Sequence, residues 1–240
     1  MDVRRGVALF AWAAAGVPLL VAGPTAAAGS PAEQAQRTCR GVPATIVGSG
    51  ELTGTSGRDV IVATRADTQV RAGGGDDLVC GSRIVRGQAG ADEIHFAGRV
   101  TGRDDLFISG GAGDDEIRFH KRQDHAALGT DVGVFGGPGA DLMIGAKGSL
   151  WFSGGAGNDR LFSGSDDYLL DGDGGDDVLR GGSDQDIMSG GDGDDRLYGY
   201  AASDDLSGGR GHDEVWGGAD WDVCAHGNEI EHGCEADDWV

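Results

Sequence analysis

Residues 190–198 read Gly190-Gly191-Asp192-Gly193-Asp194-Asp195-Arg196-Leu197-Tyr198, and residues 154–162 repeat the pattern as Gly154-Gly155-Ala156-Gly157-Asn158-Asp159-Arg160-Leu161-Phe162. Both stretches have the form Gly-Gly-x-Gly-x-Asp-x-apolar-x. From residue 136 to residue 225 the chain divides into ten consecutive frames of nine residues without an insertion. The eighth position of every frame is apolar: Met143, Phe152, Leu161, Leu170, Leu179, Met188, Leu197, Leu206, Val215 and Cys224. Nonapeptide repeats of this kind are typical of a parallel β-helix.

Each frame can supply one short strand and one turn. A single apolar position per frame suits a strand that directs one side chain into a narrow interior, because neighbouring side chains in a strand point in opposite directions. Two strands and two turns close one coil of two frames, so alternate frames stack in the same row. We therefore predict an all-β protein, a parallel β-roll (β-helix or solenoid) of nonapeptide repeats.

These residues resemble the hemolysin-type calcium-binding repeats of the RTX family, over roughly residues 54–225. The resemblance implies a β-roll in which six residues of each repeat form a calcium-binding turn and three form a strand. The residue types indicate the same chemistry, because glycines let carbonyl groups approach an ion closely and the sixth-position Asp adds negative charge. Calcium takes six to eight oxygen ligands at about 2.3–2.6 Å, which two stacked turns can provide. We expect Ca²⁺ as the bound ion.

Alternate frames give one row of turns with complete ligand sets and one with incomplete sets. The first row has frames starting at 136, 154, 172, 190 and 208, and its five turns could hold four ions, one in each gap. Its candidate ligands are the sixth-position aspartates and fourth-position glycines Asp141, Asp159, Asp177, Asp195, Asp213, Gly139, Gly157, Gly175, Gly193 and Gly211. The second row, starting at 145, 163, 181, 199 and 217, has Leu150 and Tyr168 at its first two sixth positions. We expect two weaker sites there, or none, from the remaining candidates Asp186, Asp204 and Asp222.

Upstream, residues 54–135 show the same frame with irregular spacing. Asp59 and Asp77 are two frames apart, so they fall in one row, and Asp92 and Asp115 are further candidate ligands. The intervals from Asp77 to Asp92, from Asp92 to Asp115 and from Asp115 to Asp141 are not multiples of nine. We therefore expect trimmed or bulged turns in these coils, with the largest irregularity at residues 119–135. That segment contains His120 and His125, for which a solvated loop is favoured over a zinc or catalytic site.

The two ends of the chain carry signals for export and cross-linking. Residues 1–28 have the pattern of a signal peptide: Arg4 and Arg5, an apolar stretch over 6–22, and a small-residue cleavage site at 26–28. Cleavage would leave no membrane span. We expect a lead-in and cap over 29–53, the irregular roll over 54–135, the regular roll over 136–225 and a C-terminal cap over 226–240.

Four cysteines in an exported chain favour disulfides. Cys39, Cys80, Cys224 and Cys234 allow three pairings, of which the local choice joins Cys39 to Cys80 and Cys224 to Cys234.

The charge balance excludes a nucleic-acid binder. The chain has 40 acidic and 19 basic side chains and a formal net charge of -21, opposite in sign to what phosphate binding requires. Residues 136–225 alone hold 19 acidic and 5 basic side chains. Stacked carboxylates repel each other, so we predict that this region is disordered without calcium and β-rich with it.

Two functional classes stay open. The first is a secreted, extracellular bacterial protein that binds calcium and has a structural or surface role. The second is an adhesion or carbohydrate-binding module with a cell-surface or glycan partner, engaged for instance through residues 119–135. An enzyme is not expected, because no Gly-x-Ser-x-Gly, His-Glu-x-x-His or phosphate loop occurs. Interior or flanking packing is favoured over ligand binding for the aromatic residues Trp151, Phe152, Phe162, Tyr168, Tyr198, Trp216 and Trp221.

Overall fold

The computed structural model describes residues 37–96, 106–120, 132–146, 150–166, 168–225 and 230–234, and the statements below concern these residues. They form strands and turns and contain no helix. The predicted signal peptide and most of the predicted C-terminal cap lie outside the described residues. None of the described segments is a helix long and apolar enough to cross a membrane.

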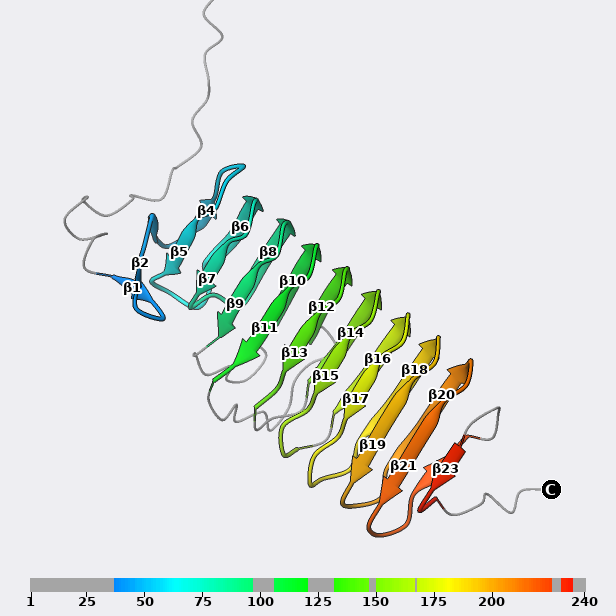
Figure 1. Ribbon diagram of the computed structural model, residues 1–240. Coiled ribbons are helices and arrows are strands. Elements are labelled where there is room, and N and C mark those ends of the chain that lie inside the picture. Colours follow the sequence, from blue (N-terminus) through cyan, green and yellow to red (C-terminus); the bar gives the residue numbers. More distant parts are fainter. Residues whose placement is uncertain are drawn as a thin grey trace, which may run out of the picture.

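Two parallel sheets run along the length of the molecule (Figure 1). One sheet has ten strands, in the spatial order β22-β20-β18-β16-β14-β12-β10-β8-β6-β4. Its strands are β4 (Glu51–Thr53), β6 (Gln69–Gly74), β8 (Ile84–Ala89), β10 (Leu106–Ala112), β12 (Val132–Pro138), β14 (Trp151–Ala156), β16 (Leu169–Gly174), β18 (Ile187–Asp192), β20 (Asp205–Arg210) and β22 (Val223–Cys224).

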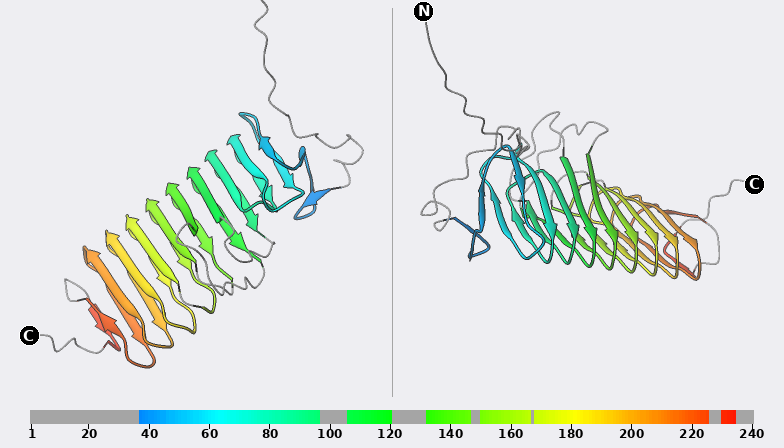
Figure 2. Two further views of the ribbon diagram at one scale, coloured as in Figure 1. Left: turned by 180° about the vertical axis from the view of Figure 1, so that it is seen from behind. Right: turned by 90° about the horizontal axis from the view of Figure 1, so that it is seen from above.

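The second sheet has eleven strands, in the order β23-β21-β19-β17-β15-β13-β11-β9-β7-β5-β3. They are β3 (Ile46–Gly48), β5 (Val60–Ala63), β7 (Leu78–Cys80), β9 (Glu93–Phe96), β11 (Glu116–Phe119), β13 (Leu142–Ile144), β15 (Arg160–Phe162), β17 (Val178–Arg180), β19 (Arg196–Tyr200), β21 (Glu214–Gly218) and β23 (Ile230–His232). Successive strands alternate between the sheets, so the chain winds as a solenoid, as the views from behind and above show (Figure 2). The predicted parallel β-roll is confirmed.

A single narrow core fills the space between the sheets. All ten eighth-position side chains predicted to point inward are buried, with at most 2% of their surface exposed. Leu161 of β15 pairs with Leu179 of β17, one coil further along the chain. Burial of one such side chain stabilises the fold by roughly 1.5–3 kcal/mol. The repeat therefore works as predicted, with one core residue per strand and one coil per two frames.

The aromatic residues divide between the interior and the outer faces. Phe152 and Tyr168 are buried, as interior packing predicts. In contrast, Trp151 is 40% exposed and Trp221 is 63% exposed. Tyr198 and Trp216 are only half-buried and stack on each other on the outside of the eleven-stranded sheet, with ring centroids 4.5 Å apart. Interior packing therefore accounts for Phe152 and Tyr168 and packing at strand-flanking positions for Tyr198 and Trp216, whereas Trp151 and Trp221 are exposed.

The irregular spacing of residues 54–135 comes from connections of different length in one row of turns. Gln69 pairs with Ile84, Glu93 with Glu116 and Leu106 with Val132, so the first register step is shorter than two frames and the other two are longer. The shortened connection, residues 81–83, joins β7 to β8, and the extra residues lie in sequence between β9 and β10 and between β11 and β12. All three belong to the second row. In the first row, the connections between strands have the same length in these coils: residues 90–92, 113–115 and 139–141.

Disulfides join the predicted local pairs near both ends of the roll. Cys39 bonds to Cys80, with Cα atoms 5.8 Å apart, and Cys224 bonds to Cys234, with Cα atoms 5.7 Å apart. The first bond attaches a small antiparallel hairpin, β1 (Thr38–Cys39) and β2 (Val42–Pro43), to strand β7. The second attaches the turn after β23 to β22.

Candidate metal centre

Sixth-position aspartates form a continuous ladder of hydrogen bonds along the first row. The backbone N–H of each one, up to the last, donates to Oδ1 of the aspartate in the next coil, over distances of 2.7–2.9 Å. The members in order are Asp59, Asp77, Asp92, Asp115, Asp141, Asp159, Asp177, Asp195 and Asp213. The row thus includes the upstream candidates despite their irregular spacing, because the irregular connections lie on the other side of the roll.

In most of these aspartates the second carboxylate oxygen has no hydrogen-bond donor among the described residues. Oδ2 is buried and without a partner among the described residues in eight members of the row: Asp77, Asp92, Asp115, Asp141, Asp159, Asp177, Asp195 and Asp213. A buried carboxylate oxygen without a donor costs several kilocalories per mole unless a cation compensates it. The row is therefore a set of regularly repeated positions where a cation would be stabilised.

Glycine at the first position leaves space beside each of these oxygens. A Cβ at Gly136 would lie 2.2 Å from Oδ2 of Asp141 and 2.6 Å from the carbonyl oxygen of Gly154, in the next coil. A Cβ at Gly154 would meet Asp159 and Gly172 in the same way, at 2.3 and 2.8 Å. A carboxylate oxygen from one turn and a carbonyl oxygen from the next coil therefore converge beside these glycines, and likewise beside Gly172 and Gly190. Such all-oxygen donor sets are those that calcium prefers, so the residues present fit that ion.

Glycine at the fourth position is required for two reasons. Gly157 has φ of +133°, in the region that L-residues with a side chain avoid, and its Cβ would lie 1.9 Å from the carbonyl oxygen of Gly139. The predicted positions Gly139, Gly157, Gly175, Gly193 and Gly211 all have positive φ values. These glycines allow successive turns to stack in backbone contact.

Burial raises the pKa values of seven first-row carboxyls. The pKa is raised to about 6 for Asp92, Asp159 and Asp195 and to about 7 for Asp115 and Asp141. The pKa reaches about 8 for Asp177, which lies in the middle of the regular coils. Desolvation is the main cause; the backbone N–H bond from the preceding aspartate opposes it, and neighbouring aspartate charges add to it. Ionisation of these carboxyls near neutral pH therefore lowers the stability of the folded state.

Asp59, at the N-terminal end of the row, is saturated by protein donors. Its Oδ2 accepts hydrogen bonds from the backbone N–H of Thr55 at 2.7 Å and from the Thr55 hydroxyl at 2.9 Å. Its Oδ1 accepts from the Thr45 hydroxyl at 3.1 Å. Protein donors therefore contact both carboxylate oxygens of Asp59. The contact with Thr45 could not be predicted from the repeats, because Thr45 precedes the first repeat.

The second row contains a shorter ladder with a different beginning. The N–H of Tyr168 donates to Oδ1 of Asp186 at 2.9 Å, and the ladder continues to Asp204 and Asp222. Tyr168 itself is buried, and its hydroxyl donates to the carbonyl oxygen of Ala146 at 2.6 Å. Leu150 is also buried. Side chains of the protein therefore occupy the positions where the first coils of this row lack carboxylates.

Asp186 and Asp204, neighbours in the second row, differ in the surroundings of Oδ2. Oδ2 of Asp186 accepts a hydrogen bond from the backbone N–H of Gly182 at 2.7 Å. Oδ2 of Asp204 is buried and has no donor among the described residues, and burial raises the pKa of Asp204 to about 7. The second row therefore offers fewer positions that favour a cation than the first row does.

One cluster of metal-ligating residues was not found from the sequence. Glu93, His95 and Glu116 place one potential ligand atom each within 4.8 Å of one another on the outside of the eleven-stranded sheet. Glu93 and Glu116 lie at corresponding positions of adjacent coils, but their spacing is not a multiple of nine. Their pairing therefore depends on a register that nonapeptide counting does not supply.

An ion-binding parallel β-roll is the class that this fold and these rows define. The chain matches the family model described as RTX calcium-binding nonapeptide repeat over residues 53–83, 107–119, 135–170, 171–206 and 198–229. These ranges cover more than half of the chain, and the protein belongs to this family, whose nonapeptide repeats bind Ca²⁺. A comparison with curated proteins gave no match.

Proposed function

We propose that the protein is a secreted calcium-binding protein that holds several Ca²⁺ ions between stacked first-row turns and is folded or stabilised by them. The observation that carries this proposal is the series of eight buried Oδ2 atoms that have no donor in the part of the chain that the structure describes. Seven of these atoms belong to residues within the matched calcium-binding repeats, and the eighth, in Asp92, belongs to the same hydrogen-bond ladder.

The proposed ligands are the carboxylates of that series and the backbone carbonyl groups of the turns around them. Proximity of Asp141 Oδ2 and the Gly154 carbonyl oxygen to one point beside Gly136 supports ligands from adjacent coils. The fourth-position glycines are proposed as further carbonyl ligands of the regular coils. Asp186, Asp204 and Asp222 are proposed as a weaker set, whereas Asp59 has a closing role because Thr45 and Thr55 already satisfy its carboxylate.

The charge of the regular coils supports coupled folding and binding. Residues 136–225 carry 19 acidic and 5 basic side chains, and first-row carboxyls with raised pKa values oppose the folded state when they are ionised. An ion that binds only the folded state stabilises it by mass action. Calcium would supply both the positive charge and the missing partners of Oδ2.

Two disulfides support a location outside the cytosol, because such bonds persist in oxidising compartments. Together with the predicted signal peptide, they favour export of the chain, with residues 29–53 and 226–240 as caps. A binding role rather than catalysis is proposed, because the buried aspartates all belong to the two rows of turns.

An adhesion role is the second candidate, and a specific observation favours it. Trp151, Leu169 and Ile187 are neighbours on three consecutive strands of the ten-stranded sheet. Their exposed fractions are 40%, 41% and 51%, so they form an apolar stripe on the outer surface. A glycan or cell-surface binding assay on the calcium-loaded protein tests it, with Trp151→Ala and a deletion in residues 119–135 as variants. Loss of binding in either variant would support adhesion.

Far-UV circular dichroism of the chain without the predicted signal peptide, residues 1–28, tests the proposed function. In a chelator we expect the spectrum of a disordered chain, and in millimolar calcium that of a β-protein. Magnesium at the same concentration is the matched control, because it demands a smaller octahedral site and dehydrates reluctantly. Identical folded spectra with and without calcium would contradict the proposal.

A further inference from the structure

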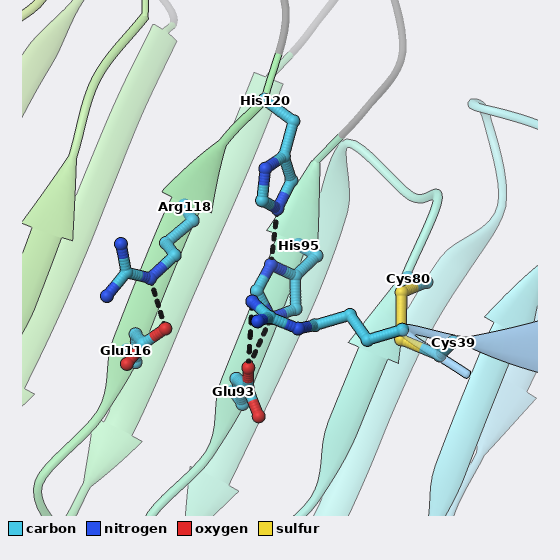
Figure 3. A network of polar contacts seen from close by, with 8 residues as sticks. Cys39, Cys80, Glu93, His95, Glu116, Arg118 and His120 are labelled. Atoms are coloured by element: carbon cyan, nitrogen blue, oxygen red, sulfur yellow. Dashed lines mark hydrogen bonds and ion pairs between the residues drawn. A yellow bond between two sulfur atoms is a disulfide. The ribbon is translucent and has the colours of Figure 1, made fainter. Parts of the chain in front are cut away.

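A polar network lies on the outside of strands β9 and β11 (Figure 3). It begins at Glu93 and Glu116, the first residues of these strands after the first-row turns. Glu93 pairs with Glu116 and His95 pairs with Arg118 across these two strands. Ile94, between Glu93 and His95, points into the core and is buried. Glu93 and His95 therefore point outward, yet His95 is only 2% exposed. An outward imidazole so deeply covered indicates a built environment rather than a solvated surface residue.

Both ring nitrogens of His95 are held at short distances. Nε2 lies 2.6 Å from Oε1 of Glu93, and Nδ1 lies 2.6 Å from Nε2 of His120. The two imidazole rings stack, with centroids 4.8 Å apart. A neutral imidazole whose second nitrogen is held by another group is the usual arrangement of a histidine metal ligand.

A positive group already occupies the space between the potential ligand atoms. Nη1 of Arg40 lies 3.2 Å from Nε2 of His95 and 3.3 Å from Oε1 of Glu93. The disulfide between Cys39 and Cys80 (Figure 3) joins the hairpin that contains Arg40 to strand β7, in which Cys80 pairs with His95 of β9. The Glu93 carboxylate and the His95 imidazole therefore form a position that attracts a cation, and the Arg40 guanidinium lies next to both groups.

Neither neutral form of His95 satisfies all of these contacts. With its proton on Nε2, the ring donates to Glu93 but presents an N–H group to the N–H of Arg40. With its proton on Nδ1, the ring donates to His120, but its Nε2 lone pair faces the Glu93 carboxylate oxygen at 2.6 Å. A metal ion on Nε2 would resolve the second arrangement, because it would bind the lone pair and the carboxylate while Nδ1–H still donates to His120.

We propose that Glu93, His95 and Glu116 form a transition-metal site of the zinc type, separate from the calcium rows, in which Arg40 holds the cation position when no metal is bound. Imidazole nitrogen and carboxylate oxygen suit Zn²⁺ and related ions, whereas Ca²⁺ takes oxygen ligands. His120 is a positioning residue for His95. The side chains of Glu93 and Glu116 are 37% and 34% exposed, so they can rotate to bring the donor atoms to bonding distance.

The carboxylate of Glu116 can contribute a ligand to the same site. Arg118 binds Glu116 through its Nε. Oε1 accepts this bond, which leaves the other oxygen of Glu116 for a metal. Three protein ligands would leave one position of a tetrahedral ion open.

Binding of Co²⁺ and Zn²⁺ to the full chain in saturating calcium tests this proposal, because calcium then occupies the rows of turns. Visible absorption of Co²⁺ reports nitrogen ligation, and Zn²⁺ competition gives the zinc affinity. We expect a single histidine-dependent site per chain. Glu116→Gln and His95→Gln should each lower the affinity by more than the roughly 10–100-fold typical of an outer-shell partner, and His120→Asn should lower it within that range.

Two further variants distinguish a built site from adventitious binding. Arg40→Gln should raise the affinity, because it removes the competing cation. His212→Gln is the matched control, since this exposed histidine lies in a first-row turn outside the cluster. The Zn²⁺ affinity of this variant should equal that of the unmodified protein. Glu116 is partly exposed, so Glu116→Gln keeps the test valid even if His95→Gln does not fold. Unchanged Co²⁺ spectra and Zn²⁺ affinity in Glu116→Gln, or no gain in Arg40→Gln, would overturn the proposal.

Discussion

The two rows of turns come from the same repeat, but only the first keeps its geometry along the whole roll. The first-row ladder runs from Asp59 to Asp213 without a break, whereas the second-row ladder begins at Tyr168. Shortened and lengthened connections fall on the second row, where hydrogen bonds and buried side chains replace carboxylates in the first regular coils. The difference indicates that stacking of adjacent first-row turns constrains the sequence, while the opposite side of each coil tolerates change.

Backbone contact between first-row turns gives the largest expected effect. Gly157→Val should prevent folding of the calcium-loaded roll or lower its stability severely, since the residue has φ of +133° and its Cβ would lie 1.9 Å from the Gly139 carbonyl oxygen. The backbone conformation alone costs roughly 1–3 kcal/mol, and displacement of the neighbouring turn adds to that.

Gly57→Ala is the control for this substitution. A Cβ at Gly57, in the turn at the N-terminal end of the row, has no atom within 4 Å. Its effect should stay within about 0.5 kcal/mol. Thermal unfolding in saturating calcium measures both variants, and equal melting temperatures would show that first-row stacking does not limit the sequence.

Proton binding to the first row should make the calcium-free chain depend on pH. Folded-state pKa values of about 6 to 8 exceed the ordinary value of 3.8, so the folded form binds more protons than the unfolded form in between. The contribution of these groups is fully present below the unfolded pKa and is lost as pH rises through the folded pKa values. Calcium-free protein should therefore gain β-structure as the pH falls from 8 to 5.5.

Circular dichroism in chelator across that pH range is the measurement. Calcium affinity should fall over the same range, because protons and calcium compete for the same carboxylates. A calcium-free chain that loses structure as the pH falls would contradict the raised pKa values.

Tyr168 offers a smaller test, of the second row alone. Tyr168→Phe removes the hydroxyl that donates to Ala146 and leaves that carbonyl group with one bond fewer. The expected loss is about 1 kcal/mol of unfolding free energy, with calcium affinity unchanged. Urea unfolding at saturating calcium, paired with a calcium titration, measures both quantities. A large fall in affinity would indicate that the second-row coils near Tyr168 take part in ion binding.

Counting residues predicts the regular coils well, because the nine-residue period fixes which side chain points inward. Each predicted interior residue from Met143 to Cys224 is buried, and the local disulfide pairing is also confirmed. The continuity of the row through Asp92 and Asp115 could not be predicted in this way. The sequence interval between two first-row aspartates includes one connection from each row. Only the strand register shows that the second-row connection alone varies in length.

Contacts between distant segments account for the rest. Closure of the row at Asp59 depends on Thr45, which precedes the repeats, and the environment of His95 depends on Arg40 in the N-terminal hairpin. Neither contact follows from the repeat pattern. The signal peptide stays a prediction, since residues 1–28 lie outside the described part of the chain.

Calorimetric calcium titration of Asp177→Asn beside Asp186→Asn tests the central claim most directly, because the two variants make the same chemical change in different rows. Asp177 has a buried Oδ2 without a donor among the described residues, whereas Oδ2 of Asp186 accepts a hydrogen bond from the N–H of Gly182. The account predicts that Asp177→Asn lowers calcium affinity and bound stoichiometry far more than Asp186→Asn. Equal losses in the two variants, or a larger loss in Asp186→Asn, would contradict it.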